Sequence, residues 1–142
     1  MTKLNWCAVF STISLIFANA ALAQPATGLQ SKLIGHWKLE SIDLSGEKPY
    51  GAKPQGAMYI DTTGHYSVIV ISDGGARSLA YFGSYKTNDA AGTVTYHIDD
   101  ATQTTANGRN ETRLVSFNGD ELVQQSLPAP GRPVLKVVWK RS

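Results

Sequence analysis

Polar and apolar residues alternate with a period of two in many segments of the chain after residue 34. In residues 35–42, Trp37, Leu39 and Ser41 share one face while Lys38 and Glu40 share the other, as in a strand buried on one side. Similar segments follow, separated by stretches rich in Gly, Pro, Asn and Asp. They are residues 57–61, 65–72, 79–86, 93–99, 112–117, 121–127 and 134–141. The pattern predicts eight β-strands, preceded by one helical turn at residues 28–32.

The short connections between these segments predict an all-β fold, an eight-stranded antiparallel up-and-down barrel. Sequential hairpins need no long crossover, and closure of the sheet leaves no exposed edge. The outer faces of the first and last strands carry Lys38, Glu40, Lys136 and Lys140, which a lipid-facing barrel would not. A soluble barrel is therefore expected. Residues 65–72 are apolar on both faces, so their outer face is expected to meet a helix, a loop or a second subunit in a homodimer.

The first 23 residues have the pattern of a cleavable signal peptide. Lys3 precedes an apolar run over residues 6–18. Ala21-Leu22-Ala23 then has the form of a cleavage site, with small residues at its first and third positions. The mature domain is then residues 24–142, in the periplasm or secreted, and it has no span of the membrane. The single cysteine, Cys7, lies in the leader, so the mature chain has no disulfide.

Charge and motifs exclude several classes of function. The formal net charge is +2, and the basic residues are scattered, which does not predict binding to nucleic acid. The three histidines lack the spacing of metal ligands, and neither a nucleophile motif nor a phosphate-binding glycine loop is present. Neither a metal nor a cofactor is therefore expected.

The first and last strands should meet at one end of the barrel. In a closed antiparallel barrel, Arg141 near the end of the last strand comes close to Trp37 near the start of the first. A guanidinium over an indole is worth about 0.5–2 kcal/mol. Trp139 faces inward near the same seam. These residues are predicted to close the barrel and to take no part in chemistry.

The ordered set of segments resembles the lipocalin-like domain family, small bacterial and fungal relatives of the lipocalins. The resemblance spans nearly all of the mature chain. It places Gly35, Trp37 and Arg141 where lipocalins keep a Gly-x-Trp and a stacked Arg, and it implies a barrel with a ligand cup. Residues 100–110 depart from the family in being polar and rich in Thr. The matching segments are residues 33–39, 54–60, 63–68, 80–85, 92–97, 113–122 and 139–141.

An interior of eight strands can be filled by side chains or can hold one small ligand. Tyrosines suit an amphipathic ligand, because their rings are apolar and their tips are polar. Arg113 shares a face with Val115 and Phe117, and its partner would be a ligand anion, Asp99, Asp100 or Glu111. His97 would face solvent if Val94 faces inward, and would reach the cup otherwise. The candidate ligand-binding residues are Tyr59, Tyr66, Tyr81, Tyr85, Tyr96, His97 and Arg113, with Gly83 leaving space.

Three functions remain open. The first is an exported carrier that holds a small hydrophobic or amphipathic molecule in the barrel, with the loop of residues 43–56 covering the mouth. The second is an enzyme of the isomerase, cyclase or lyase type that uses Tyr and His97 as acid–base groups, with Arg113 holding an anion. The third is an interaction or inhibitor protein with a packed barrel that acts through its loops.

Overall fold

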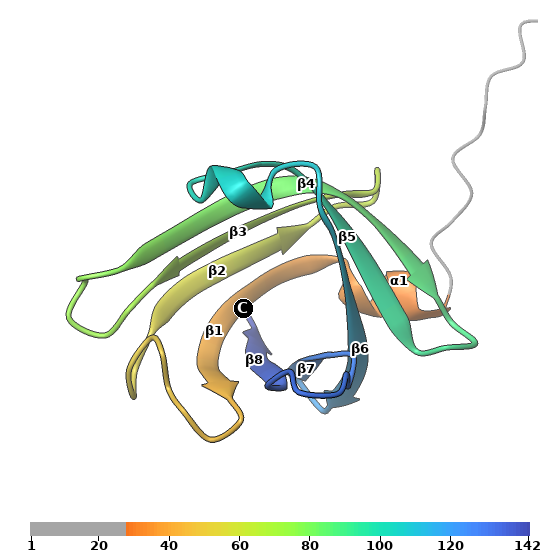
Figure 1. Cartoon of the computed structure of the whole chain (residues 1–142). Coiled ribbons are helices and arrows are strands. Elements are labelled where there is room, and N and C mark those ends of the chain that lie inside the picture. Colours follow the sequence, from red (N-terminus) through yellow and green to blue (C-terminus); the bar gives the residue numbers. More distant parts are fainter. Residues whose placement is uncertain (1–27) are drawn as a thin grey trace, which may run out of the picture.

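The structure, a computed structural model that describes residues 28–142, is a closed barrel of eight antiparallel strands (Figure 1). Each strand pairs with the next in the chain, and the eighth closes the barrel against the first. The predicted all-β up-and-down barrel is therefore confirmed. The predicted signal peptide lies outside the described residues. The elements are α1 (Gly28–Leu33), β1 (Gly35–Leu44), β2 (Gln55–Ile60), β3 (His65–Ile71), β4 (Ser78–Asn88), β5 (Thr93–Ala101), η1 (Thr104–Ala106), β6 (Asn110–Asn118), β7 (Glu121–Ser126) and β8 (Leu135–Arg141).

The strands begin and end close to the predicted residues, with one difference in the segment of residues 100–110. The predicted strands, residues 93–99 and 112–117, leave this polar segment without a periodic signal as the loop between them. Instead, β5 extends to Ala101, η1 forms a short 3₁₀ turn, and β6 already begins at Asn110. Pairing of Phe82 with Asp100 and of Tyr81 with Ala101 continues the ladder between β4 and β5 beyond the periodic part of the sequence.

A β-bulge in β1 corrects one predicted orientation. Trp37 and Leu39 face inward, but the register against β8 shifts between Leu39 and Ser41. Such an extra residue changes which positions face the core. Ile42 is therefore the next buried side chain of β1, and Ser41, which was expected on the inner face with Leu39, is only half-buried.

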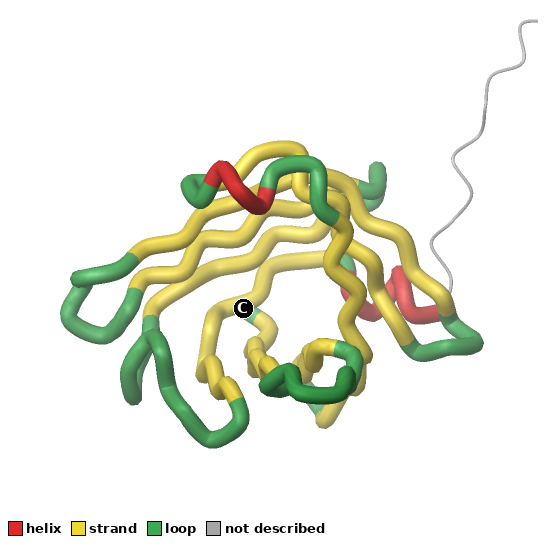
Figure 2. Tube along the Cα trace, viewed as in Figure 1, coloured by secondary structure: helices red, strands yellow, loops and turns green. Residues whose placement is uncertain are grey.

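The two ends of the barrel differ. α1 lies at the end where β1 begins, and its Leu33 is completely buried in the core. The long connections gather at the other end, where β1 ends; in Figure 2 the loops appear as green segments between the yellow strands. Among residues 28–142 there is no helix with the length and apolar character needed to cross a membrane. We call the end with α1 the closed end and the other the open end.

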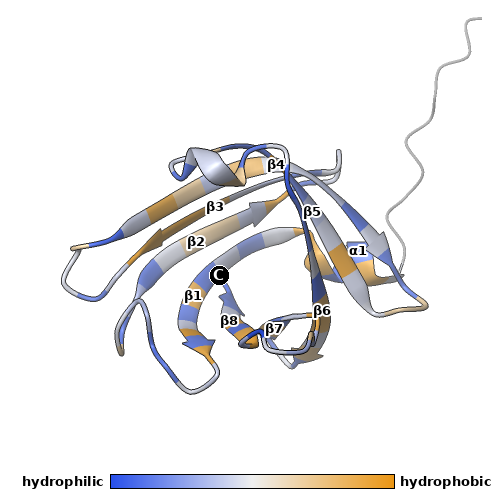
Figure 3. Ribbon diagram, in the orientation of Figure 1, coloured by the Kyte–Doolittle hydropathy of each residue, from blue (hydrophilic) through white to orange (hydrophobic). Residues whose placement is uncertain are grey.

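The outer face of β3 carries exposed apolar side chains. Tyr66, Val68 and Val70 point into the core, so Ile69 and Ile71 point outward, and they are 50% and 39% exposed. Figure 3 shows the apolar character of this strand. Within the described residues nothing covers this face, so the expected helix or loop over it is absent. The homodimer through residues 65–72 stays a prediction.

The guanidinium of Arg141 in β8 stacks on the ring of Trp37 in β1 and so stabilises the seam between these two strands. The guanidinium carbon of Arg141 lies 4.1 Å from the centre of the Trp37 ring. Its two terminal nitrogens donate to the carbonyls of Ile34 and Lys32 at 3.0 and 2.6 Å. Gly35 has a φ of +132°, and a Cβ there would lie 2.8 Å from Nη1 of Arg141. The glycine therefore leaves the space in which the guanidinium sits.

Trp37→Ala should lower the free energy of unfolding by about 3–5 kcal/mol, because it empties a buried site under the guanidinium. Arg141→Ala should cost less in the Trp37→Ala background than in the wild type, by about 0.5–2 kcal/mol, since the stacking is already lost. Urea denaturation of the two single variants and the double variant measures this coupling. Arg132→Ala, in an exposed loop, is the control. Additive costs would mean that the stacked contact does not stabilise the seam.

Candidate ligand-binding cavity

A cavity of about 190 Å³ opens inside the barrel, in its open half. Inward-facing residues of β2 to β8 line it, because the period of two brings every second side chain of a strand to the interior. The barrel is therefore neither fully packed nor wide enough for a large ligand. The lining residues are Met58, Tyr66, Val68, Leu79, Tyr81, Tyr96, Ile98, Ala101, Gln103, Ala106, Glu111, Arg113, Gln124, Leu135, Val137 and Trp139.

A β-bulge in the pairing of β4 with β5 shapes the side of the cavity that is lined by Tyr66, Tyr81 and Tyr96. The register shifts between Phe82 and Gly83, and a Cβ on Gly83 would collide with the carbonyl oxygen of His97. The hydroxyl of Tyr66 donates to this same oxygen at 3.3 Å. Gly83 was expected to leave space for a ligand. It is needed instead because the β5 backbone comes so close.

Three tyrosines form a connected cluster on this wall. The ring of Tyr66 lies 6.0 Å from that of Tyr81 and 4.6 Å from that of Tyr96, between centroids. The carboxamide of Gln124 donates to the Tyr96 hydroxyl at 2.6 Å. The Tyr81 hydroxyl has no hydrogen-bond partner among residues 28–142. The cluster therefore presents hydroxyl groups to the cavity.

Burial keeps these hydroxyls protonated. Removal from water raises the pKa of Tyr81 to about 12, and the nearby Arg113 opposes this only in part. Burial also raises the pKa of Tyr66 and of Tyr96, for which desolvation is the largest cause. Tyrosines are neutral near pH 7 in any case, and burial extends this neutral, hydrogen-bond-donating form of the cluster to higher pH.

Arg113 and Glu111 bring one ion pair to the cavity. Both face inward from β6, and Nη1 of Arg113 lies 3.0 Å from the Glu111 carboxylate. The Arg113 side chain is 18% exposed and that of Glu111 is 40% exposed, so the pair lies where the cavity meets solvent. Of the partners considered for Arg113, Glu111 is the one in contact. Because Glu111 is negative and Arg113 is positive, the lining of the cavity has no net charge.

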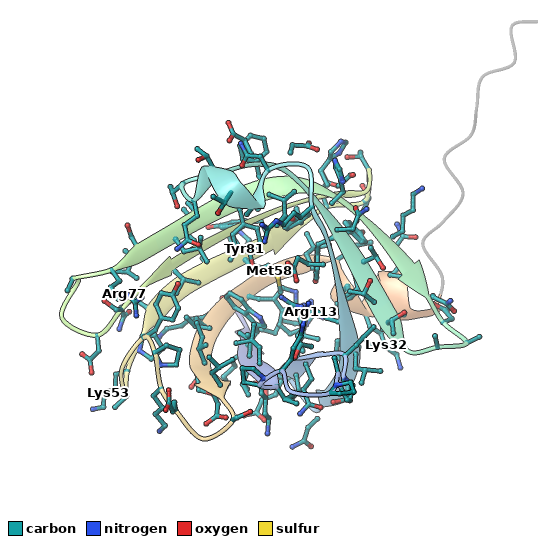
Figure 4. The ribbon with its side chains drawn as sticks, in the orientation of Figure 1. Lys32, Lys53, Met58, Arg77, Tyr81 and Arg113 are labelled. Atoms are coloured by element: carbon teal, nitrogen blue, oxygen red, sulfur yellow. The ribbon has the colours of Figure 1, made fainter. Side chains whose placement is uncertain are left out.

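The opposite wall is apolar. β8 contributes Leu135, Val137 and Trp139, and Met58 of β2 is also in the lining. Trp139 was predicted only to close the barrel, and its place in the lining corrects that prediction. In Figure 4 Tyr81, Met58 and Arg113 all lie within the barrel, from three different strands. Nε1 of Trp139 is buried and has no hydrogen-bond partner among the described residues. The cavity thus has a wall with hydroxyl groups and a wall without them.

The loop that borders the cavity is not the predicted one. The segment of residues 43–56 was expected to cover the mouth, but the lining includes Gln103 and Ala106, beside and within η1. Residues 45–54 are instead tied to the hairpin between β3 and β4. There Asp73 donates its N–H to the Tyr50 carbonyl at 2.8 Å, and Arg77 donates to the Pro49 carbonyl at 3.1 Å.

Three of the predicted ligand-binding residues lie elsewhere. Tyr59 points outward and is 45% exposed, because its neighbours Met58 and Ile60 take the inner face of β2. His97 is also on the outer face, beside Asn110 and Asp99, since Val94 and Tyr96 face inward. Tyr85 is buried, but at the closed end, where its hydroxyl donates to the Asp61 carbonyl at 2.8 Å. The structure brings Tyr66, Tyr81, Tyr96 and Arg113 together.

Sequence reasoning missed Gln124, Met58, Gln103 and Ala106 as lining residues. Alternation could have found Gln124, because it shares the inner face of β7 with Leu122 and a buried carboxamide needs a partner. Gln103 and Ala106 had no such signal, since they lie in a segment without periodicity. Residues 28–142 contain no group of three or more His, Cys, Asp or Glu side chains arranged to hold a metal.

The buried tyrosines should make folding sensitive to alkali. Above pH 10 the unfolded chain loses tyrosine protons that the folded chain keeps, so the free energy of unfolding falls as pH rises towards 12. Each such tyrosine contributes about 1.4 kcal/mol per pH unit. Urea denaturation at pH 9, 10 and 11 measures the slope. It should be less steep in Tyr81→Phe; an equal slope would contradict the burial of this hydroxyl.

Comparison of the chain with protein-family models finds no match, and comparison with curated proteins finds none either. The fold follows from the strand pairing described above. The case for a function is carried by the shape, the charge and the hydrogen-bonding groups of the cavity.

Proposed function

We propose that this protein is an exported, lipocalin-like binding protein that holds one small amphipathic molecule inside its barrel. The observation that carries the proposal is the cavity with two unlike walls. Hydroxyl groups of Tyr81 and Tyr96 lie on one wall, and Val137 and Trp139 lie on the other. Pockets for small molecules are mostly apolar with a few convergent polar groups, as here.

The volume sets the size of the ligand. An engineered apolar cavity of about 150 Å³ in another protein holds one benzene molecule. The cavity of about 190 Å³ therefore suits one ring with a short substituent. A long acyl chain or a tetrapyrrole would need the lining to move apart. The proposed ligand is accordingly a compound of about ten non-hydrogen atoms.

Binding is favoured over the two alternatives. The enzyme hypothesis relied on His97 as an acid–base group, and His97 lies on the outer face, away from the cavity. The remaining tyrosines have raised pKa values, which makes them poor proton acceptors near pH 7. The interaction hypothesis assumed a packed barrel, whereas this one has an internal cavity.

Export is part of the proposal and rests on the sequence. Lys3, the apolar run and Ala21-Leu22-Ala23 support a leader that is removed before Gln24. The N-terminal residue of the protein recovered from the periplasm or the medium tests it. Gln24 is the expected residue, and Met1 would contradict cleavage.

One-ring compounds such as acetophenone and phenol should bind with a Kd on the order of 10–100 µM. Ala106→Phe should raise that Kd at least about tenfold, because a ring at this lining position occupies the ligand's space. Thr104→Phe, in the same 3₁₀ turn but exposed and outside the lining, is the matched control. Isothermal titration calorimetry measures the three proteins.

Two results would overturn the proposal. One is a Kd above 1 mM for every one-ring compound tested, since so low an affinity would mean that the cavity is not a binding site for such molecules. The other is an equal affinity in the wild type and in Ala106→Phe, which would place the ligand outside the barrel.

A further inference from the structure

The charges that line the cavity cancel. Glu111 and Arg113 are the only charged side chains among its described lining residues, and they contact each other at 3.0 Å. A ligand carboxylate would have to compete with Glu111 for the guanidinium, and a ligand amine would have to compete with Arg113 for the carboxylate. Either ion would leave one member of the pair with a weaker partner in a half-buried place, which costs free energy.

The interior of the barrel also disfavours ionisation of the side chains that line it. Burial raises the pKa of Tyr66, Tyr81 and Tyr96, which means that an ionised group is less stable here than in water. A ligand ion that entered the cavity would suffer the same desolvation. A neutral ligand avoids it.

The cavity contains hydrogen-bond donors that have no acceptor among the described residues. The Tyr81 hydroxyl has no partner among residues 28–142, so its hydrogen is free. Tyr96 and Gln124 share one hydrogen bond at 2.6 Å, and the pair keeps a donor hydrogen whichever way round the carboxamide sits. The indole N–H of Trp139, a group that can only donate, is a buried donor in the lining without a described partner.

We propose that the ligand of this cavity is a neutral one-ring compound whose polar end is a hydrogen-bond acceptor, such as the carbonyl of an aromatic ketone, aldehyde or lactone. Its ring lies against Val137 and Trp139 of β8. Its carbonyl oxygen accepts from the Tyr81 hydroxyl on the opposite wall. This inference rests on the proposed function and adds the chemical class of the ligand.

Three compounds of equal size separate the effect of a charge on the ligand from the effect of its hydrogen-bond acceptor. Acetophenone has the ring and the carbonyl, benzoate replaces the methyl ketone by a carboxylate, and α-methylstyrene replaces the carbonyl oxygen by a CH₂ group. Calorimetry at pH 7 should give a Kd for acetophenone at least about tenfold lower than for either of the others. α-Methylstyrene lacks the hydrogen bond to a buried donor, which is worth about 1.4 kcal/mol. Benzoate can make that hydrogen bond, but it must bring a charge out of water and into the cavity.

Two variants assign the effect to residues. Tyr81→Phe should bring the Kd of acetophenone close to that of α-methylstyrene, because the donor is gone while the ring stays. Tyr59→Phe is the matched control, since Tyr59 is exposed on the outer face. Glu111→Gln should tighten benzoate binding by about tenfold, because Arg113 then lacks its carboxylate partner and is free for that of the ligand.

The outcomes distinguish this inference from the proposed function. If all three compounds bind and benzoate binds as tightly as acetophenone, the barrel is a binding protein but its ligand is an acid, and the inference is wrong. Equal affinity for acetophenone and α-methylstyrene would likewise refute the role of the acceptor. If none of them binds, the proposed function itself fails.

Discussion

The stacking of Arg141 on Trp37 is the contact on which the architecture depends. It joins the last strand to the first, and its hydrogen bonds to the carbonyls of Ile34 and Lys32 hold the chain between α1 and β1. The Trp37 N–H in turn donates to the Leu33 carbonyl at 2.8 Å. One end of the barrel is thereby closed by structural residues. The free volume is left in the other half, where the cavity lies.

The chemistry of the cavity follows from which strand contributes which side chain. A period of two sends every second residue inward, so the strands from β2 to β8 each add one to three side chains to the lining. β4 and β5 add Tyr81 and Tyr96, whereas β8 adds only Leu135, Val137 and Trp139. The two walls differ because these strands lie on different sides of a closed sheet. A molecule with a polar end and an apolar ring matches this division.

Alternation predicted the strands and the barrel, because it reflects burial on one side of a sheet. It failed where an extra residue enters a strand: the bulge in β1 puts Ile42 in place of Ser41 on the inner face. The sequence did not place all the tyrosines correctly. A shift of one residue in the alternation exchanges the inner and outer faces of a strand, and Tyr59 lies on the outer face of β2. The wall from Gln103 to Ala106 had no periodic signal at all.

The location of the ligand can be read from the indole N–H signals in a ¹H–¹⁵N NMR spectrum of residues 24–142. That segment contains Trp37 and Trp139 as its two tryptophans. Trp37 is fixed at the closed end by its bond to Leu33, whereas Trp139 lines the cavity. Addition of acetophenone should shift the Trp139 signal through the nearby ring and leave the Trp37 signal in place. A titration that moves neither signal, or moves that of Trp37 alone, would contradict a ligand site inside the barrel.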